Sequence, residues 1–166
     1  MCFGAPKMAM QPQADVLTSV ALTHPMMTGL RAGACHQGQR WQWDGVEFEV
    51  LHPPASLADD RASKPNAHSC VLRIRAQGQT VLLTADIEAL QEQALLQRMG
   101  DALKADVLLV PHHGSKTSST EGFIDTVQPR WALFQHGYRN RYGHPAPVVV
   151  QRYQQRGIRQ LNSPTC

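Results

Sequence analysis

The sequence predicts an α/β layered fold, with strands first and strands alternating with helices later. Two observations support this prediction. The first part of the 166-residue chain has short runs of alternating apolar and polar residues, whereas the later part alternates buried-type strands with helical segments. In the later part, polar clusters follow the strands, as they do in α/β folds whose strand-end loops carry the chemistry. The length fits one domain with a substantial core.

Strands dominate the first part of the chain. Residues 15–22 are a short apolar run with β-branched residues, which predicts a strand. Residues 29–38 contain several glycines and are expected to form turns. Residues 39–51 alternate on both sides of Asp44-Gly45, and an Asp-Gly pair between alternating runs predicts a β-hairpin.

The middle of the chain leads from strands to helices. Residues 53–66 are polar and contain proline, so we expect a loop. Residues 69–84 form a second predicted hairpin, and residues 87–99 have the apolar spacing of a helix that ends at Gly100. The remaining elements are predicted to be a strand over 106–110, a helix over 121–127 after the N-cap candidates Ser118, Ser119 and Thr120, a strand over 130–135, a helix over 145–156 and a strand over 158–161.

The composition limits the classes of protein to which the chain can belong. The net charge of +3, from 16 basic and 13 acidic residues, is too small to indicate a nucleic-acid partner by itself. No stretch of about 18 apolar residues predicts a membrane span. The 4 cysteines form no C-x-x-C pair, so we expect free thiols. Residues 1–13 look like an irregular lead-in, which leaves a predicted domain over 14–166.

Polar residues at two predicted strand ends are candidates for a metal or phosphate site. Asp86 follows a strand directly, where a carboxylate is placed to bind a metal, although it could also cap the helix that begins at Ile87. His112 and His113 follow the next buried strand and precede a run of hydroxyls with one lysine. Imidazoles suit a metal, and hydroxyls with a cation at a helix start suit a phosphate. The alternative is a serine-rich capping turn with incidental histidines.

A third cluster lies between Gly137 and Pro145, where two arginines alternate with two tyrosines ahead of His144. Arginine and tyrosine together suit phosphate contact and base stacking, and His144 suits an acid, a base or a metal ligand. The alternative is an exposed basic loop. In a fourth, weaker element, Asn66 and Ser69 could steady the site loops by hydrogen bonds.

These clusters contain strings that resemble one known family. The strings T-A-D-I (84–87), V-P-H-H-G-S (110–115) and Y-G-H-P (142–145), together with segments 35–53 and 66–72, are similar to the C-terminal motifs of the metallo-β-lactamase-like domain of the ComEC family of DNA-uptake channel proteins. The resemblance covers about residues 14–162. One small departure is Ala85, which stands where the family usually has glycine.

The resemblance implies a fold of two β-sheets between layers of helices, with divalent metals at one edge. Asp86 and His112 match metal ligands, and Zn²⁺ or Mn²⁺ would suit these donors. His113, Ser115 and His144 match residues expected near the scissile phosphate. The residues that we expect to bind substrate are Asn66, Ser69, Lys116, Thr117, Ser118, Arg139 and Arg141. The implied reaction is hydrolysis of a phosphodiester in single-stranded DNA.

The chain departs from the family mainly in lacking the upstream H-x-H-x-D-H motif, which supplies most ligands of one metal. We therefore expect a C-terminal portion of the fold with an incomplete metal site that is inactive in isolation. The parent would be a bacterial inner-membrane protein, with the rest of that protein as partner. Uncovered sheet edges predict self-association, including domain swapping. The alternatives are a non-catalytic module that binds DNA or a partner, and a related metallo-hydrolase that acts on RNA or small phosphoesters.

Overall fold

The computed structural model describes residues 15–57, 64–137 and 140–163, so the predicted lead-in over residues 1–13 lies outside the described residues. The strands are β1 (Asp15–Thr18), β2 (Arg31–Ala34), β3 (Arg40–Trp43), β4 (Val46–His52), β5 (Val71–Ala76), β6 (Gln79–Leu83), β7 (Val107–Leu109), β8 (Trp131–Phe134) and β9 (Arg159–Asn162). The α-helices are α1 (Ala89–Met99), α2 (Glu121–Val127) and α3 (Pro147–Gln155). Short 3₁₀ helices are η1 (Pro25–Met27), η2 (Ala55–Leu57), η3 (Pro65–His68), η4 (Gly100–Leu103) and η5 (Pro111–Gly114).

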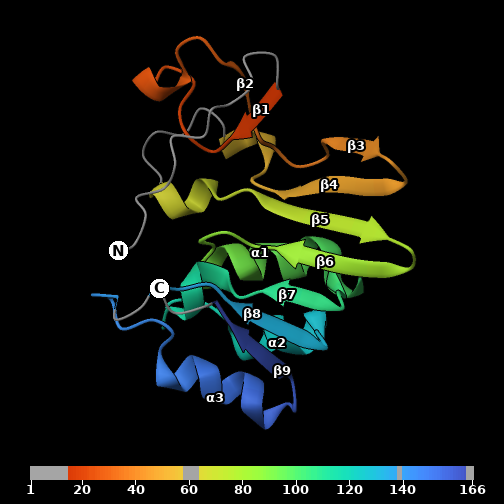
Figure 1. Ribbon diagram of the computed structural model, residues 1–166, viewed down its shortest axis with the longest axis vertical. Coiled ribbons are helices and arrows are strands. Elements are labelled where there is room, and N and C mark those ends of the chain that lie inside the picture. The colour runs from red at the N-terminus through yellow and green to blue at the C-terminus, as the bar shows by residue number, and fades with distance from the viewer. Residues whose placement is uncertain (1–14, 58–63, 138–139, 164–166) are drawn as a thin grey trace.

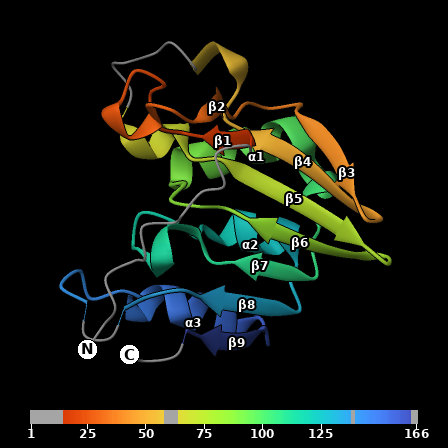
Figure 2. The same ribbon diagram turned by 45° about the horizontal axis from the view of Figure 1, so that its top comes forward.

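Most of the described strands belong to one sheet with the order β3-β4-β5-β6-β7-β8-β9. The pairs from β3 to β6 are antiparallel, whereas β6, β7, β8 and β9 run parallel. Strands β1 and β2 form a separate parallel pair. The helices α1, α2 and α3 lie on one face of the large sheet, behind the strands in Figure 2; in Figure 1, α3 is seen below β9. Parallel strands need crossover connections, and α1, α2 and α3 supply them.

The predicted elements are largely confirmed, because their local sequence patterns agree with the structure. Both predicted hairpins form, and their turns place Asp44-Gly45 and Gln77-Gly78 at positive φ, as a two-residue hairpin turn requires. Helix α1 begins with a capping box between Glu88 and Gln91. Two expectations were wrong: the first strand ends at Thr18, and the glycine-rich segment 29–38 contains β2, which pairs with β1 from a distance in sequence.

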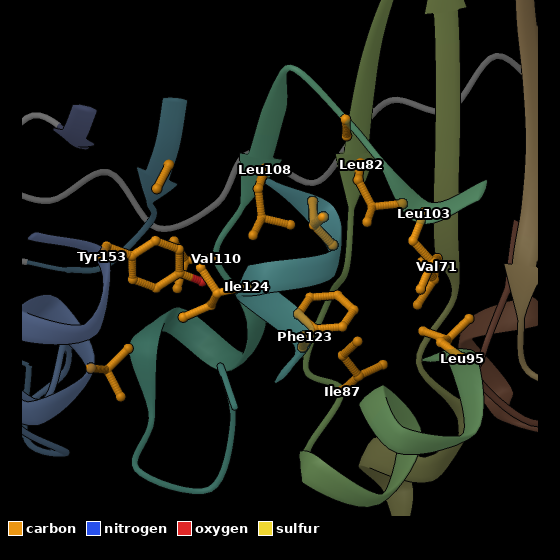
Figure 3. Close-up of a cluster of buried hydrophobic side chains, with 14 of the residues drawn as sticks. Val71, Leu82, Ile87, Leu95, Leu103, Leu108, Val110, Phe123, Ile124 and Tyr153 are labelled. Atoms are coloured by element: carbon orange, nitrogen blue, oxygen red, sulfur yellow. The ribbon is translucent and has the colours of Figure 1, made fainter. Parts of the chain in front are cut away.

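The core lies between the helices and one face of the large sheet. Figure 3 shows Val71, Leu82 and Leu108 of the sheet near helix residues Leu95 and Phe123, and all five are fully buried. On the other face, alternate residues such as Leu72, Val81 and Leu109 are only half-buried. Strands β3 and β9 form the sheet edges, and Trp43 on β3 is 69% exposed. Self-association through these edges stays a prediction.

The expectation of free thiols is wrong for two of the cysteines. Cys35 and Cys70 form a disulfide with a Cα–Cα distance of 6.1 Å. The bond ties the end of β2 to the residue that precedes β5. Sequence spacing could not reveal this pair, because the two residues stand 35 positions apart and only the tertiary fold brings them together. No helix in the described ranges combines the length and apolar character that a membrane crossing requires.

Candidate active site at the carboxyl ends of the parallel strands

The sheet topology brings the three main polar clusters together. Because β6, β7 and β8 are parallel neighbours, the loops that follow them leave the same edge of the sheet. Backbone hydrogen bonds join these loops: the His112 N–H donates to the Ala85 carbonyl over 2.9 Å, and the Ala146 N–H donates to the Gly114 carbonyl over 2.9 Å. The loops therefore form one connected unit.

The loop after β7 has a left-handed backbone at successive residues. His112, His113 and Gly114 have φ values of 49°, 56° and 80°. Residues other than glycine adopt this region at a cost, and such strain concentrates at functional sites. Glycine is required at position 114 for a second reason, since a Cβ there would lie 2.7 Å from the Cβ of Pro145. The loop that contains His112 and His113 therefore packs directly against the loop that contains His144.

Position 85 has a similar backbone. Ala85 has a φ of 48°, in the region that glycine adopts without strain. This explains why a glycine suits this position in the family that the sequence resembles. Asp86 follows directly, and it is not the N-cap of α1, because Glu88 has that place. The alternative explanation of Asp86 as a helix cap is therefore wrong.

Asp86 faces His113 across the gap between the first two loops. The Asp86 Oδ1 atom lies 3.4 Å from His113 Nε2, and both side chains are close to half exposed. His113 Nδ1 lies 2.6 Å from the Gln135 carbonyl oxygen, which can only accept, so Nδ1 carries a proton. In a neutral ring, Nε2 is then an acceptor. Two acceptors that face each other need either a shared proton or a bound cation between them.

His112 lies beside a different carboxylate. Its Nδ1 atom is 3.4 Å from Glu88 Oε1 and 3.4 Å from Thr117 Oγ1. Glu88 Oε1 also accepts hydrogen bonds from Thr117 Oγ1 over 3.0 Å and from Asn66 Nδ2 over 3.4 Å. A carboxylate at Nδ1 favours the tautomer with the proton there, which leaves Nε2 free to act as a donor atom toward a metal.

His144 completes the histidine cluster. Its ring centroid lies 5.8 Å from that of His112, and its ring stacks on Tyr142 at 5.9 Å. The Asn140 side chain binds both the N–H and the carbonyl of His144, which fixes its backbone. Within the described residues, His144 Nδ1 is buried without a hydrogen-bond partner. Burial, followed by the proximity of His112 and His113, lowers the pKa of His144, so its ring is neutral at pH 7.

These donors suit a divalent metal in kind, since imidazole and carboxylate are ordinary ligands of Zn²⁺ and Mn²⁺. A bound cation could contact Asp86 Oδ1 and His113 Nε2, and His144 Nδ1 has no hydrogen-bond partner within the described residues. However, no three His, Cys, Asp or Glu side chains of the described residues are grouped so that they could hold one metal ion. Tight sites use three or four ligands, so the described part of the chain provides a partial set.

The residues expected to bind substrate fall into two groups. Lys116 and Arg141 are exposed, and Arg139 lies outside the described residues. In contrast, Ser118 is 1% exposed and its hydroxyl donates to the carbonyls of Pro111 and Ser115. Ser69 and Ser115 are also buried, and Asn66 and Thr117 donate to Glu88. Through these hydrogen bonds, the buried serines together with Asn66 and Thr117 support the loops in this structure.

Two glutamates with a part in the site were missed from the sequence. Glu88 connects α1, the histidine loop and Asn66. Glu92 is fully buried and accepts from the backbone N–H groups of Ser119 and Thr120 at 2.5 and 2.8 Å, and from the Thr120 hydroxyl at 2.7 Å. It thus holds the segment that leads into α2. Thr120 has the N-cap position, as expected from the sequence, but its side chain makes no capping hydrogen bond. The capping-box spacing of Glu88 and Gln91 was the one local pattern that could have revealed Glu88.

Comparison with known proteins finds relatives among competence and recombination proteins. The chain is 41% identical over 125 residues to competence protein ComA of Neisseria gonorrhoeae, which covers 75% of the chain and 18% of ComA. It is 41% identical over 127 residues to ComE operon protein 3 of Bacillus subtilis (76% and 16% covered) and 39% identical over 118 residues to recombination protein 2 of Haemophilus influenzae (71% and 14% covered). The chain therefore spans less than a fifth of the length of these relatives. No family model matches it.

Solved structures resemble the chain in fold alone. CmlA, a diiron β-hydroxylase from Streptomyces venezuelae, aligns with a TM-score of 0.51 and 14% identity over 84% of the chain and 34% of CmlA. A protein described as a Zn-dependent hydrolase of the metallo-β-lactamase superfamily, from Thermotoga maritima, aligns with a TM-score of 0.43 and 15% identity over 85% of the chain and 67% of that protein. The expected α/β fold class is confirmed by the mixed sheet with its crossover helices and by the likeness in fold to CmlA.

Proposed function

Because this chain belongs, as one segment, to the ComEC family of competence proteins, we propose that it is the C-terminal part of a metal-dependent nuclease domain in a DNA-uptake protein. The parent is a bacterial inner-membrane protein, and this segment lies outside the bilayer. Its substrate is single-stranded DNA, and the reaction is hydrolysis of a phosphodiester bond. The chain by itself has little or no activity, because the rest of the domain completes the metal site.

The observation that supports this proposal most strongly is the approach of Asp86 Oδ1 to His113 Nε2, 3.4 Å apart at the carboxyl ends of β6 and β7. The backbone carbonyl of Gln135 fixes the tautomer of His113, which directs its lone pair toward the carboxylate. Carboxylate and imidazole side chains that meet at a strand end are ordinary ligands of divalent metals. The arrangement therefore favours a site for a cation.

We assign Asp86 and His112 as ligands, with His113 beside them at the reaction centre. Glu88 holds His112 with its Nδ1 protonated, and the backbone of the histidine loop keeps both rings at the sheet edge. When bound, divalent metal ions such as Zn²⁺ or Mn²⁺ would ionise a water molecule and polarise the phosphoryl group.

The remaining exposed groups would bind and orient the substrate. Lys116 and Arg141 are exposed cations on the loops after β7 and β8, where they can contact phosphates of a single strand. Neutral His144 can accept a proton near the reaction centre, because its pKa lies below its usual value. Ser115 and Ser118 stabilise the loop after β7 by hydrogen bonds: the Ser115 hydroxyl pairs with the Thr117 hydroxyl, and the Ser118 hydroxyl donates to the Pro111 carbonyl.

One observation favours a different function, a non-catalytic module that binds DNA or a partner protein. Within the described residues no group of three potential ligands converges on one point. A module of this kind would bind DNA through Lys116 and Arg141 without hydrolysing it. The two functions differ in whether metal binding and cleavage depend on Asp86 and His112.

The first test is a calorimetric titration of the chain with Mn²⁺ and Zn²⁺. We expect weak binding that is lost in Asp86→Ala and in His112→Ala. Asp101→Ala is the matched control, because its side chain is 86% exposed on η4, away from the three site loops. Equal binding by the wild-type chain and all three variants would contradict the ligand assignment.

The second test uses the full-length parent protein, in which the site is complete. Asp86→Ala and His112→Ala should each reduce metal-dependent cleavage of single-stranded DNA by at least about 10–100-fold, the loss that even outer-shell partners of metal ligands cause. Unchanged cleavage in both variants would refute the nuclease proposal. Parallel assays with RNA and with a small phosphodiester distinguish the DNA substrate from the related hydrolase activities.

A further inference from the structure

A cavity opens beside the histidine cluster and has not been used in the proposed function. It has a volume of about 530 Å³, which lies in the range of small-molecule sites. Its described lining consists of His113, Gln135, His136, Gly137, Asn140, Tyr142, His144 and Ser163. Two of these residues, His113 and His144, also belong to the candidate reaction centre. The cavity and the Asp86–His113 pair therefore share a wall.

The lining is rich in aromatic rings and poor in strongly charged groups. None of the described residues that line the cavity is Lys, Arg, Asp or Glu. Tyr142 and His144 stack with their planes 19° apart, and Tyr142 remains 66% exposed despite this contact and the Arg141 guanidinium 4.8 Å from its ring centroid. Such a wall does not attract a phosphate, but it suits a planar, neutral ring system.

Two polar side chains of the lining, Asn140 and Ser163, are already hydrogen-bonded within the protein. Asn140 Nδ2 donates to the carbonyls of Gly137 and His144, and Asn140 Oδ1 accepts from the His144 N–H. Ser163 Oγ donates to the His136 carbonyl and accepts from the His136 N–H. These groups hold the cavity in shape, and they are not available to recognise the edge of one particular base.

From this we propose that the cavity holds a nucleobase of the substrate strand, stacked against Tyr142 and the neighbouring histidine rings without preference for its identity. The inference rests on the proposed function and deepens it: the strand is held through one unpaired base beside the scissile phosphate, while Arg141 and Lys116 contact flanking phosphates. A base that is paired in a duplex cannot enter, so the cavity makes the site selective for single strands.

The test compares two labelled strands of the same length and charge, an oligothymidylate and a strand in which every base is replaced by an abasic tetrahydrofuran unit. Binding to this chain is measured by fluorescence anisotropy in the presence of EDTA. We expect the abasic strand to bind about 10-fold more weakly or worse. Tyr142→Ala should remove most of this difference, and Tyr142→Phe should keep it. Trp43→Ala is the matched control, since Trp43 is a similarly exposed aromatic residue on edge strand β3.

Equal binding of the two strands, or an unchanged preference in Tyr142→Ala, would overturn the base-pocket proposal. A Trp43→Ala effect as large as that of Tyr142→Ala would also overturn it, because the preference would then be a general property of exposed aromatic residues. An oligouridylate strand and free thymidine monophosphate serve as competitors that distinguish DNA, RNA and mononucleotides as the source of the base. The assay contains no metal, so its failure is separate from failure of the metal titration and cleavage tests.

Discussion

The loops at the carboxyl ends of β6, β7 and β8 have a buried side and an exposed side, and the polar groups on the two sides differ in their hydrogen bonding. On the buried side, the carboxylate of Glu92 is fully enclosed and accepts three hydrogen bonds. On the exposed side, the carboxylate of Asp86 is 42% exposed and lies 3.4 Å from Nε2 of His113. The same functional group stabilises the fold in one place and is exposed to solvent in the other, where we propose that it binds a metal.

This comparison shows how the strained loop after β7 can persist. Left-handed residues such as His112 and His113 cost free energy, so the surrounding structure must compensate for them. The compensation comes from buried hydrogen bonds to this loop and to the residues that follow it. Glu92 accepts from the Ser119 N–H, the Ser118 hydroxyl donates to the Pro111 carbonyl, and the Tyr153 hydroxyl donates to Ser119 Oγ. Substitutions on the buried side should therefore change stability, and substitutions on the exposed side should change ligand binding.

The largest expected effect is that of the disulfide, which anchors the segment leading to Asn66 and Ser69. Reduction of Cys35–Cys70 should lower the free energy of unfolding by about 4 kcal/mol, because it releases a closed loop of 35 residues in the unfolded chain. Denaturant unfolding with and without dithiothreitol measures this difference. The double variant Cys35→Ser/Cys70→Ser should be insensitive to the reductant. A transition of the wild-type chain that is unmoved by reductant would contradict the disulfide.

The second effect tests the buried side directly. Glu92→Ala should lower the free energy of unfolding by about 3 kcal/mol or more, because two backbone N–H groups and one hydroxyl lose their acceptor. Glu92→Gln should cost less, since one oxygen acceptor remains. The control is Leu90→Ala on the same helix, whose side chain is 75% exposed. Similar unfolding curves for Glu92→Ala and Leu90→Ala would show that the carboxylate does not support the loop.

A smaller effect should appear in the pH dependence of stability. His52 is 2% exposed, and its Nε2 atom lies 2.9 Å from the Ala67 carbonyl, so it holds the Asn66 segment. Burial lowers the pKa of His52 below 6.5, which means that the unfolded chain binds the proton more tightly. Its contribution to stability is therefore present above pH 6.5 and is lost as the pH falls. Unfolding measured between pH 7.5 and 5 should show this loss, and His52→Gln should remove that part of the slope. An unchanged slope would place the titrating group elsewhere.

The smallest effect is expected on the exposed side. Asp86→Asn should change the free energy of unfolding by less than about 0.5 kcal/mol, because Asp86 is partly exposed and pairs only with a half-exposed histidine. The same substitution should abolish the metal binding proposed above. A large destabilisation by Asp86→Asn would mean that this carboxylate supports the fold, and the distinction between the two sides would fail.

Much of the site could be predicted from the sequence because its residues follow strands that have clear local patterns. The strings around Asp86, His112 and His144 stand directly after β6, β7 and β8, and the parallel pairing of these strands then brings them together. The contacts of Glu88 and Glu92 could not be predicted in this way. Their partners, Thr117 and Ser119, stand 29 and 27 positions away, and nothing in the local sequence marks them.

Local sequence patterns were enough to predict the kinds of elements, their order and the positions of the polar clusters, because hydrophobic periodicity and turn residues act over a few neighbouring positions. The tertiary structure decided the pairing of Cys35 with Cys70, the burial of Glu92, and the approach of His113 to Asp86. These features depend on contacts between segments that are distant in the chain. Which polar groups become buried and bonded, and which remain exposed and open to a ligand, follows only from the packing of the whole sheet and its helices.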